Sequence, residues 1–205
     1  NENGLENENI KVVSQDNEGN IWLGTDGSGA FRFSGNEFVN FGEKNGLASV
    51  MSIVQDNDKT YWFSTYGDGI TKYKDHVFTN FHALNSNLTN NTIWSSMLDS
   101  KNQLWFGSSG GLIKQNQGKF KVFYNTEWLP SNKITSLFED SKNHIWIGTA
   151  KGVTKIVNSD TTTYTNSSGL ETKNIRAIAE YKNTIWLGTS NGVFTSNEKG
   201  FSQWE

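Results

Sequence analysis

The 205-residue chain has no cysteine and only one proline. Without cysteine no disulfide can hold the fold together, and redox chemistry gives no indication of the compartment. No apolar run is long enough to cross a bilayer as a helix, which predicts no membrane insertion by this segment, and no signal peptide is visible. The chain begins with Asn1 rather than Met, which suggests a mature or excised piece of a longer protein.

Basic residues are also scarce. Lys and Arg number 18 against 21 Asp and Glu, so the net charge is −3, and no basic cluster stands out. This balance argues against nucleic acid and anionic membranes as partners. The chain is instead rich in 20 Gly, 8 Trp and 13 Phe. Such a composition favours short strands and tight turns around an aromatic core.

One unit of about 41 residues recurs five times, and three markers define it. The first marker is a tryptophan inside an apolar strand: Trp22, Trp62, Trp105, Trp146 and Trp186. The second is a pair ending in leucine: Gly4-Leu5, Gly46-Leu47, Asn87-Leu88, Trp128-Leu129 and Gly169-Leu170. The third is a closing aromatic motif: Phe38–Phe41, Phe78–Phe81, Phe120–Phe123, a degenerate Thr161–Tyr164, and Phe201–Trp204. Because the markers keep their order and spacing, the units are copies of one structure.

Each unit is predicted to form four short antiparallel strands. In the first unit the expected strands are 10–15, 20–25, 30–33 and 37–41. The segments between them carry Asp, Asn, Ser and Gly, which are turn residues. Apolar residues at helical spacing are missing. Four strands in a unit of this length are typical of a propeller blade.

The predicted fold is therefore an all-β propeller of five four-stranded antiparallel blades in a single domain, residues 1–205. The expected blades are approximately 3–41, 45–81, 86–123, 128–164 and 168–204. The blades either close as a five-bladed ring, which we favour, or form a five-blade section of a larger propeller. The five repeated tryptophans occupy one blade position and are predicted to be structural core between blades, not sugar-binding residues.

The repeat resembles the two-component regulator propeller repeat, most clearly at Val13–Gly29 and Ile134–Val153. The Asp-containing turn, the Trp-Leu-Gly-Thr strand and the Asn-Gly-Leu lead-in occur together, and the resemblance covers all five units. It implies a ligand-sensing domain of bacterial hybrid sensor kinases, acting in signal transduction in the periplasm or outside the cell. Oligosaccharides are frequent ligands of such domains. The membrane helix, immunoglobulin-like domain and kinase of those sensors are missing from this sequence.

Metal and catalytic motifs are weak. The segment Asp16-Asn17-Glu18-Gly19-Asn20 superficially resembles a calcium loop but lacks the later bidentate Glu and repeats as a hairpin turn. The three histidines, at positions 76, 82 and 144, fall at different blade positions, so no metal ligand set is visible. No nucleophile elbow or phosphate loop occurs. We therefore predict no metal, no cofactor and no enzymatic activity.

Positions that vary between otherwise similar units are the best candidates for function. The residue after the first aliphatic of strand one is predicted to ring the mouth of the central channel: Lys11, Met51, Trp94, Thr135 and Arg176. Loops on the same face contribute further candidates: Tyr66, Asp68, Lys151, Glu127 and Trp128. The aromatic members could stack on sugar rings and the charged members could bind hydroxyls or a uronate carboxylate.

The sequence thus predicts a non-enzymatic module that binds an oligosaccharide or another small extracellular ligand. A protein–protein interaction scaffold is the alternative. An enzyme similar to streptogramin lyase, itself a propeller that uses a His and a magnesium ion, is the third interpretation.

Overall fold

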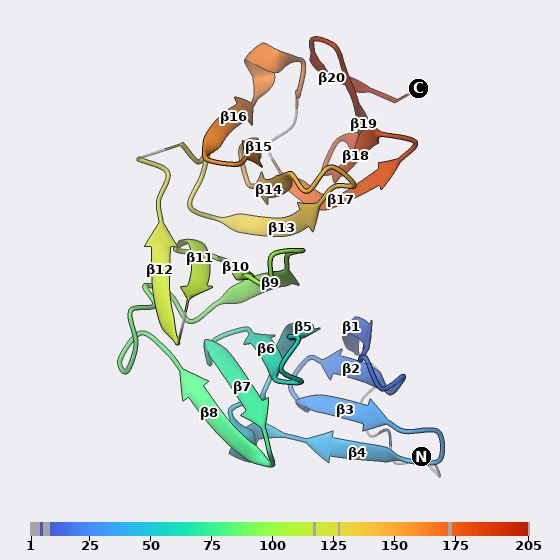
Figure 1. Ribbon diagram of the computed structural model, residues 1–205, viewed down its shortest axis with the longest axis vertical. Coiled ribbons are helices and arrows are strands. Elements are labelled where there is room, and N and C mark those ends of the chain that lie inside the picture. The colour runs from blue at the N-terminus through green and yellow to red at the C-terminus, as the bar shows by residue number, and fades with distance from the viewer. Residues whose placement is uncertain (1–4, 6–8, 117, 127, 172–173, 205) are drawn as a thin grey trace.

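The computed structural model describes residues 5, 9–116, 118–126, 128–171 and 174–204. It is built from twenty strands and two short 3-10 helices, and the strands form five separate antiparallel four-stranded sheets (Figure 1). Each sheet lies within one of the five predicted blade ranges, and the strands of a sheet follow one another in chain order. The all-β propeller class is therefore confirmed.

The strand bounds follow the predicted pattern closely. Blade one contains β1 (Ile10–Gln15), β2 (Ile21–Thr25), β3 (Ala30–Phe33) and β4 (Phe38–Phe41). Blade two contains β5 (Val50–Gln55), β6 (Tyr61–Thr65), β7 (Ile70–Lys74) and β8 (Val77–Phe81), and blade three contains β9 (Ile93–Leu98), β10 (Leu104–Ser108), β11 (Gly111–Asn116) and β12 (Lys119–Phe123). Blade four contains β13 (Ile134–Glu139), β14 (Ile145–Thr149), β15 (Gly152–Val157) and β16 (Asp160–Tyr164), and blade five contains β17 (Ile175–Tyr181), β18 (Thr184–Thr189), β19 (Gly192–Asn197) and β20 (Gly200–Gln203). The 3-10 helices η1 (Glu43–Asn45) and η2 (Asn166–Ser168) precede blades two and five.

The first strand of each blade lies on the inside of the curve, and the fourth lies outside (Figure 1). The first strands contact one another in the series β1, β5, β9, β13, β17. Among the described residues, no comparable contact joins β17 back to β1. The preference for a closed five-bladed ring was therefore wrong, and the blades form an open arc. The side chains that fill each seam set the angle between blades, and five such blades do not complete a full turn.

A seam between two blades is filled by the repeated tryptophan. The four side chains Trp22, Trp62, Trp105 and Trp146 are only 1–6% exposed. Each faces the following blade: the Trp22 ring centroid lies 4.7 Å from Tyr61 and 5.4 Å from Phe63, both in blade two. On its own blade, Trp22 stacks on the closing Phe41 at 5.3 Å. The first and third markers of the repeat thus meet in one aromatic cluster.

The repeated Asp turn fixes the indole in place. In blade three, Asp99 accepts hydrogen bonds from the backbone N–H groups of Lys101 and Gln103 at 3.0 and 2.8 Å. Its second oxygen accepts the Trp105 indole N–H at 2.8 Å. Asp16, Asp56 and Asp140 bind their own tryptophans in the same way. The aspartate therefore folds the hairpin and satisfies a buried donor at once, and the hairpin interpretation of the turns is confirmed.

In the Trp-x-Gly-Thr motif the glycine has a steric role and the threonine closes the following loop. A Cβ atom placed on Gly148 would lie 2.2 Å from the Ser136 Oγ and 2.8 Å from the Cγ2 of Ile175 in the next blade. Glycine is therefore required for the first strand of the following blade to approach. Thr149 accepts the Lys151 N–H and donates to the Gly152 carbonyl at 2.9 Å, which closes the loop between strands two and three.

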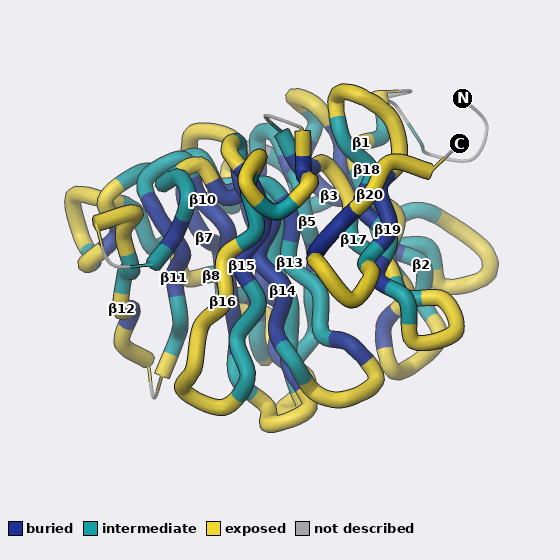
Figure 2. The backbone as a smooth tube through the Cα atoms, turned by 90° about the horizontal axis from the view of Figure 1, so that it is seen from above, coloured by how far each residue is buried: buried dark blue, intermediate teal, exposed yellow. Residues whose placement is uncertain are grey.

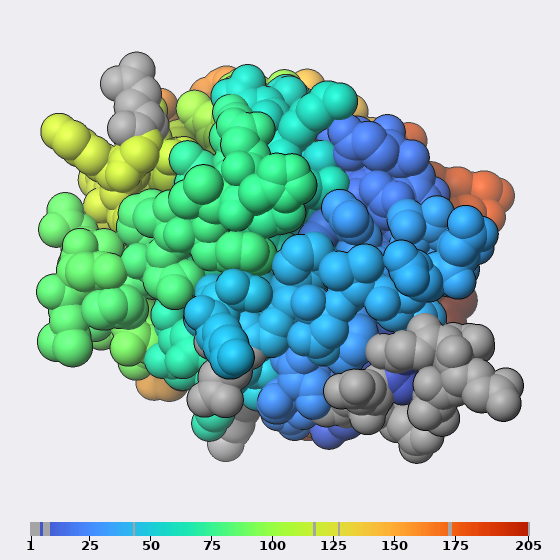
Figure 3. Space-filling view, turned by 90° about the horizontal axis from the view of Figure 1, so that it is seen from below, coloured from blue at the N-terminus to red at the C-terminus, as the bar shows by residue number. Residues whose placement is uncertain are grey.

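Burial follows this packing. Buried residues run through the middle of the strands, and exposed residues gather in the loops at the two rims (Figure 2). Blade one packs continuously against blade two in the space-filling view, where the blue and cyan surfaces meet without a break (Figure 3).

Blade five departs from the pattern. Trp186 is only partly buried, and its indole nitrogen finds no hydrogen-bond partner in the described part of the chain. The repeated aspartate is replaced by Tyr181, and the hairpin shortens to the two residues Lys182 and Asn183, both with positive φ. The prediction of Trp186 as seam core therefore needs correction, because none of the five described blades covers its outer face.

Candidate functional site

The residue after the first aliphatic of each first strand lies in a β-bulge. The ladder between strands one and two skips one residue in every blade: in blade one Ile10 pairs with Thr25 and Val12 pairs with Gly24, leaving Lys11 outside the register. The equivalent residues Met51, Trp94, Thr135 and Arg176 are skipped in the same way. A bulge redirects a side chain out of the sheet without disturbing the rest of the ladder. The five predicted residues therefore share one structural device on the inner strand, which we call the bulge ring.

An aromatic and cationic cluster lies at one side of this ring. The Tyr66 and Trp94 rings meet edge to face with centroids 5.5 Å apart, and the Lys133 ammonium lies 5.1 Å from the Trp94 ring centroid. The Trp94 indole N–H donates to the Ser109 hydroxyl at 2.9 Å, which fixes the orientation of the ring. Tyr66 is 57% exposed. Three consecutive blades, two, three and four, thus contribute to one partly exposed aromatic surface.

A polar cluster lies on the other side, at blades one and two. The Lys11 ammonium forms an ion pair with Asp26 at 3.0 Å, and the Ser49 hydroxyl donates to the same carboxylate at 3.0 Å. The hydrogen bonds from Lys11 and Ser49 hold the pKa of Asp26 below its ordinary value. The carboxylate is therefore ionised at neutral pH and holds Lys11 at the rim.

The remaining predicted residues have mixed positions. Thr135 donates to the Gly148 carbonyl and to the Ile175 carbonyl of blade five, so its hydroxyl joins two blades. Arg176 and Lys151 are exposed, and Met51 is partly buried. Asp68 accepts the Ala48 N–H at 3.3 Å and so also stabilises the preceding lead-in loop.

Trp128 lies away from the bulge ring. Its side chain packs against the core between blades three and four and lies 5.8 Å from the Phe123 ring. The structure therefore does not bring Trp128 together with Tyr66 and Trp94. Its neighbour Glu127 lies outside the described residues.

Sequence reasoning missed Lys133 and Ser49 as participants. Lys133 and Ser49 occupy the same repeat position, directly before the first strand, where the other units carry Asn9, Thr92 and Asn174. That position varies as sharply as the bulge ring does, so the signal was present. Asp26 belongs to the loop between strands two and three, a loop that also varies between units.

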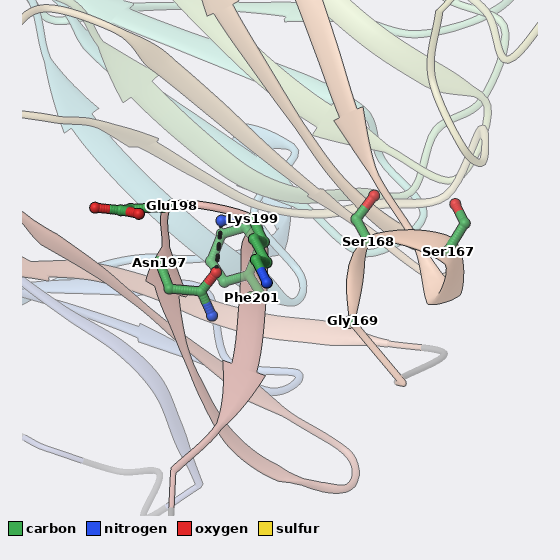
Figure 4. A pocket seen from close by; sticks show the side chains of 7 residues that line it. All are labelled: Ser167, Ser168, Gly169, Asn197, Glu198, Lys199 and Phe201. Atoms are coloured by element: carbon green, nitrogen blue, oxygen red, sulfur yellow. Dashed lines mark hydrogen bonds between the residues drawn. The ribbon is translucent and has the colours of Figure 1, made fainter.

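Other hollows lie away from this face. One, of 590 Å³, lies between helix η2 and the turn joining β19 and β20, with Ser167 and Ser168 on one side and Lys199 and Phe201 on the other (Figure 4). A second, of 180 Å³, lies in the seam of blades four and five beside the Asp turn and includes His144, which bonds Asp140 at 3.0 Å. Within the described ranges, no three His, Asp or Glu side chains gather closely enough to hold a metal ion.

Comparison with known proteins identifies the repeat. A family model described as two component regulator propeller matches residues 4–27, 87–110 and 129–151, which lie in units one, three and four. No curated protein sequence is similar enough to match the chain. In the part of the chain that the structure describes, no helix has the length and apolarity needed to cross a membrane.

Solved structures of the same fold include sensor domains. The extracellular domain of a putative hybrid two-component system from B. thetaiotaomicron superposes with a TM-score of 0.82 at 25% identity, covering 92% of this chain and 28% of that one. The extracellular domain of a putative one-component system from the same organism gives 0.82 at 20% identity, covering 98% and 30%. This chain therefore spans less than a third of either relative.

A catalytically inactive virginiamycin B lyase from Staphylococcus aureus with quinupristin also matches, with a TM-score of 0.79 at 13% identity over 98% of this chain and 71% of that one. At that identity the likeness shows only the shared fold. The matching model, the repeat and the sensor-domain likeness agree with one another: units one, three and four match the two-component regulator propeller repeat, and the whole chain is similar in fold to the sensor domains that the comparison found.

Proposed function

We propose that this chain is a non-enzymatic sensor propeller that binds an extracellular carbohydrate at the bulge ring. The observation that carries the proposal is the bulge itself. Every blade uses the same bulge to present a side chain outside its sheet, and the five side chains differ in chemistry while the seam residues repeat. A ligand without five-fold symmetry needs a different side chain from each blade, and the repeated bulge presents five different side chains in the same geometry.

The exposed aromatic surface supports a carbohydrate as the ligand. Sugar rings present C–H faces that pack on aromatic rings, and Tyr66 and Trp94 offer such a surface, held in orientation by Ser109. Lys133 lies beside them, and Arg176 is exposed in the same ring. Both cations suit hydroxyl groups or a uronate carboxylate. A periplasmic or extracellular location, as in the extracellular relatives, belongs to the same proposal.

The proposal is tested by screening the purified chain against a glycan array and then titrating the best glycan by calorimetry. We expect Trp94→Ala and Arg176→Ala each to weaken binding by about tenfold or more, the loss of a stacked ring or of a charge-assisted hydrogen bond. Neither variant is expected to move the melting temperature by more than a few degrees, because the bulge residues lie outside the ladder.

Tyr124→Ala is the matched control, since Tyr124 is an exposed aromatic, 37% accessible, that follows the outer strand β12. If Trp94→Ala and Arg176→Ala bind as tightly as the unmodified chain, the bulge ring is not the site. If no glycan binds but a protein partner is retained through the same two residues, the scaffold interpretation replaces the carbohydrate one.

A further inference from the structure

A polar contact closes the seams between blades at the rim opposite the bulge ring. The residue at the end of strand one reaches back to the turn of the preceding blade. Glu139 accepts the backbone N–H and the hydroxyl of Ser100 at 2.7 and 2.6 Å, and the equivalent Glu180 and Gln55 also accept hydrogen bonds from the preceding turn. We call this contact the rim clip. Blade three has Leu98 at this position, so the seam between blades two and three cannot form one.

A hollow of 380 Å³ opens at this unclipped seam. The hollows at the clipped seams measure 80 Å³ beside Glu139 and 180 Å³ beside Glu180. Trp62 of blade two and Leu104 of blade three line the larger hollow and belong to one buried cluster, against which Leu98 packs. Its volume falls within the range of about 300–1,000 Å³ that is typical of small-molecule sites.

Two lysines of blade two line this hollow. Lys72 pairs with Trp62 in the ladder between β6 and β7, so both side chains lie on the face toward blade three, and the Lys72 ammonium lies 5.8 Å from the Trp62 ring centroid. Lys74 lies two residues further along β7 and therefore on the same face. Within the described residues, neither lysine forms an ion pair. The hollow therefore holds two positive charges without a paired carboxylate.

The acidic residues at this seam have other roles. Asp56 accepts two backbone N–H groups of its own turn, both at 2.9 Å, and the Trp62 indole N–H at 2.8 Å. Asp58 is exposed in the same turn. Lys114 also borders the hollow, but its ammonium lies 4.6 Å from the Trp105 ring, on the face toward blade four. The glutamate that lies beside the lysines at the next two seams is absent here, because Leu98 replaces it.

Blade three supplies an uncharged polar wall. Gln115 pairs with Leu104 in the ladder between β10 and β11 and so lies on the face toward blade two, and Gln103 borders the hollow from the turn. A carboxamide both donates and accepts hydrogen bonds, which suits hydroxyl groups. The two walls therefore offer charge-assisted bonds on one side and neutral hydrogen bonds on the other.

We propose that this hollow binds a phosphate or sulfate monoester of a polyol about as large as a monosaccharide. Lys72 and Lys74 bind the oxyanion, and Gln103 and Gln115 bind hydroxyls of the polyol. The site lies at the rim opposite the bulge ring and shares no residue with it. Ester binding here therefore does not depend on whether the bulge ring binds a carbohydrate.

Calorimetric titration of the purified chain with glucose 6-phosphate, glucose 6-sulfate and glucose tests the proposal. We expect at least one ester to bind, and glucose to bind this site about tenfold more weakly or less. Lys72→Gln and Lys74→Gln should each weaken ester binding about tenfold or more. Which ester binds more tightly identifies the oxyanion. If neither ester binds, the proposal is wrong.

Lys155→Gln is the matched control. Lys155 pairs with Trp146 in blade four, and its ammonium lies 5.3 Å from that ring, so the substitution removes the same charge at a seam that Glu180 clips. We expect it, like Trp94→Ala at the bulge ring, to leave ester binding unchanged. Equal losses from Lys155→Gln and Lys72→Gln would mean that only overall charge matters. Loss of ester binding in Trp94→Ala would move the ester to the bulge ring and overturn the proposal.

Installing the missing clip provides a second arm. Leu98→Glu places at this seam the carboxylate that blades four and five carry at the same position, and we expect it to weaken ester binding about tenfold or more by neutralising the lysines. Leu98→Gln adds a clip without charge and should weaken binding less. Circular dichroism checks that both variants fold. A folded Leu98→Glu variant that binds the esters as tightly as the unmodified chain would refute the proposal, and if that variant does not fold, the comparison of Lys72→Gln with Lys155→Gln decides.

Discussion

The aspartate–tryptophan pair of blade three gives a measurable test of how a blade is held together. Asp99 is 6% exposed and accepts three hydrogen bonds, two from the turn backbone and one from the Trp105 indole. Asp99→Ala removes both carboxylate oxygens and with them all three hydrogen bonds. The backbone donors lie in a surface turn where water can replace the carboxylate, whereas the indole N–H is buried and cannot find another acceptor.

The magnitude follows from these contacts. A hydrogen bond to a charged group contributes about 1.5–3 kcal/mol, and a buried donor left without a partner costs about 1–3 kcal/mol. We therefore expect Asp99→Ala to lower the free energy of unfolding by about 3 kcal/mol, equivalent to a melting temperature about 6–12 °C lower for a chain of this size. Trp105→Phe removes the indole donor and part of the ring.

A double-mutant cycle isolates the bond between the two side chains. We expect urea unfolding of the unmodified chain, Asp99→Ala, Trp105→Phe and the double variant to give a coupling energy of about 1–2 kcal/mol. Asp58→Ala is the control, because Asp58 is an exposed residue in the corresponding turn of blade two, and its change should stay within ~0.5 kcal/mol. A coupling energy near zero would show that the aspartate acts only on its own turn.

Two further predictions concern the seams. Gly148→Ala should lower the free energy of unfolding in urea by about 1–3 kcal/mol, because the added Cβ would overlap the Ser136 hydroxyl. Gly188→Ala is the control and should change it by less than ~0.5 kcal/mol, because its Cβ would make only an ordinary contact with Ala177. Equal effects of the two substitutions would contradict the packing argument. Burial raises the pKa of Asp16 and Asp140, but hydrogen bonds outweigh burial and leave both below the ordinary value of 3.8. Their contribution to stability is therefore complete above about pH 4 and is lost as the pH falls below it through the folded-state pKa. Urea midpoints measured between pH 6 and 2 should fall less steeply for Asp140→Asn, and an unchanged slope would exclude this linkage.

The fold was predictable because every part of the repeat has a local physical reason. The tryptophan, its aspartate, the glycine and the closing aromatic all act within one seam, and the sequence repeats them at a fixed spacing. Closure of the ring was not predictable, since it depends on a small angle at each seam that no single residue encodes. The partly exposed state of Trp186 follows from the same fact, although the replacement of the repeated aspartate by Tyr181 was a visible sign that blade five differs.

The candidate site was partly predictable. Variation between units identified the residues of the bulge ring, and their position near the start of strand one led to the prediction that they surround the channel mouth. It could not reveal that Lys133 lies over the Trp94 ring or that Asp26 holds Lys11, because both contacts join residues that are far apart along the chain. Nor could it show that Trp128 turns into the core, because the lead-in residue before each leucine varies as freely as a binding residue would.

The bulge explains how one scaffold separates stability from recognition. The first aliphatic residue of strand one lies inside the ladder and points into a seam. Ile93, for example, is fully buried there, so the neighbouring blade limits which side chain can occupy that position. The next residue, Trp94, is outside the register, so its side chain leaves the seam and can change without altering the packing. Since each blade repeats this step, five adjacent positions on the inner face are free to diverge while every seam stays the same. A propeller of this kind can therefore change the chemistry of its inner face by substitutions at the bulge ring, with little cost to the seams except where a bulge side chain also bonds the next blade, as Thr135 does.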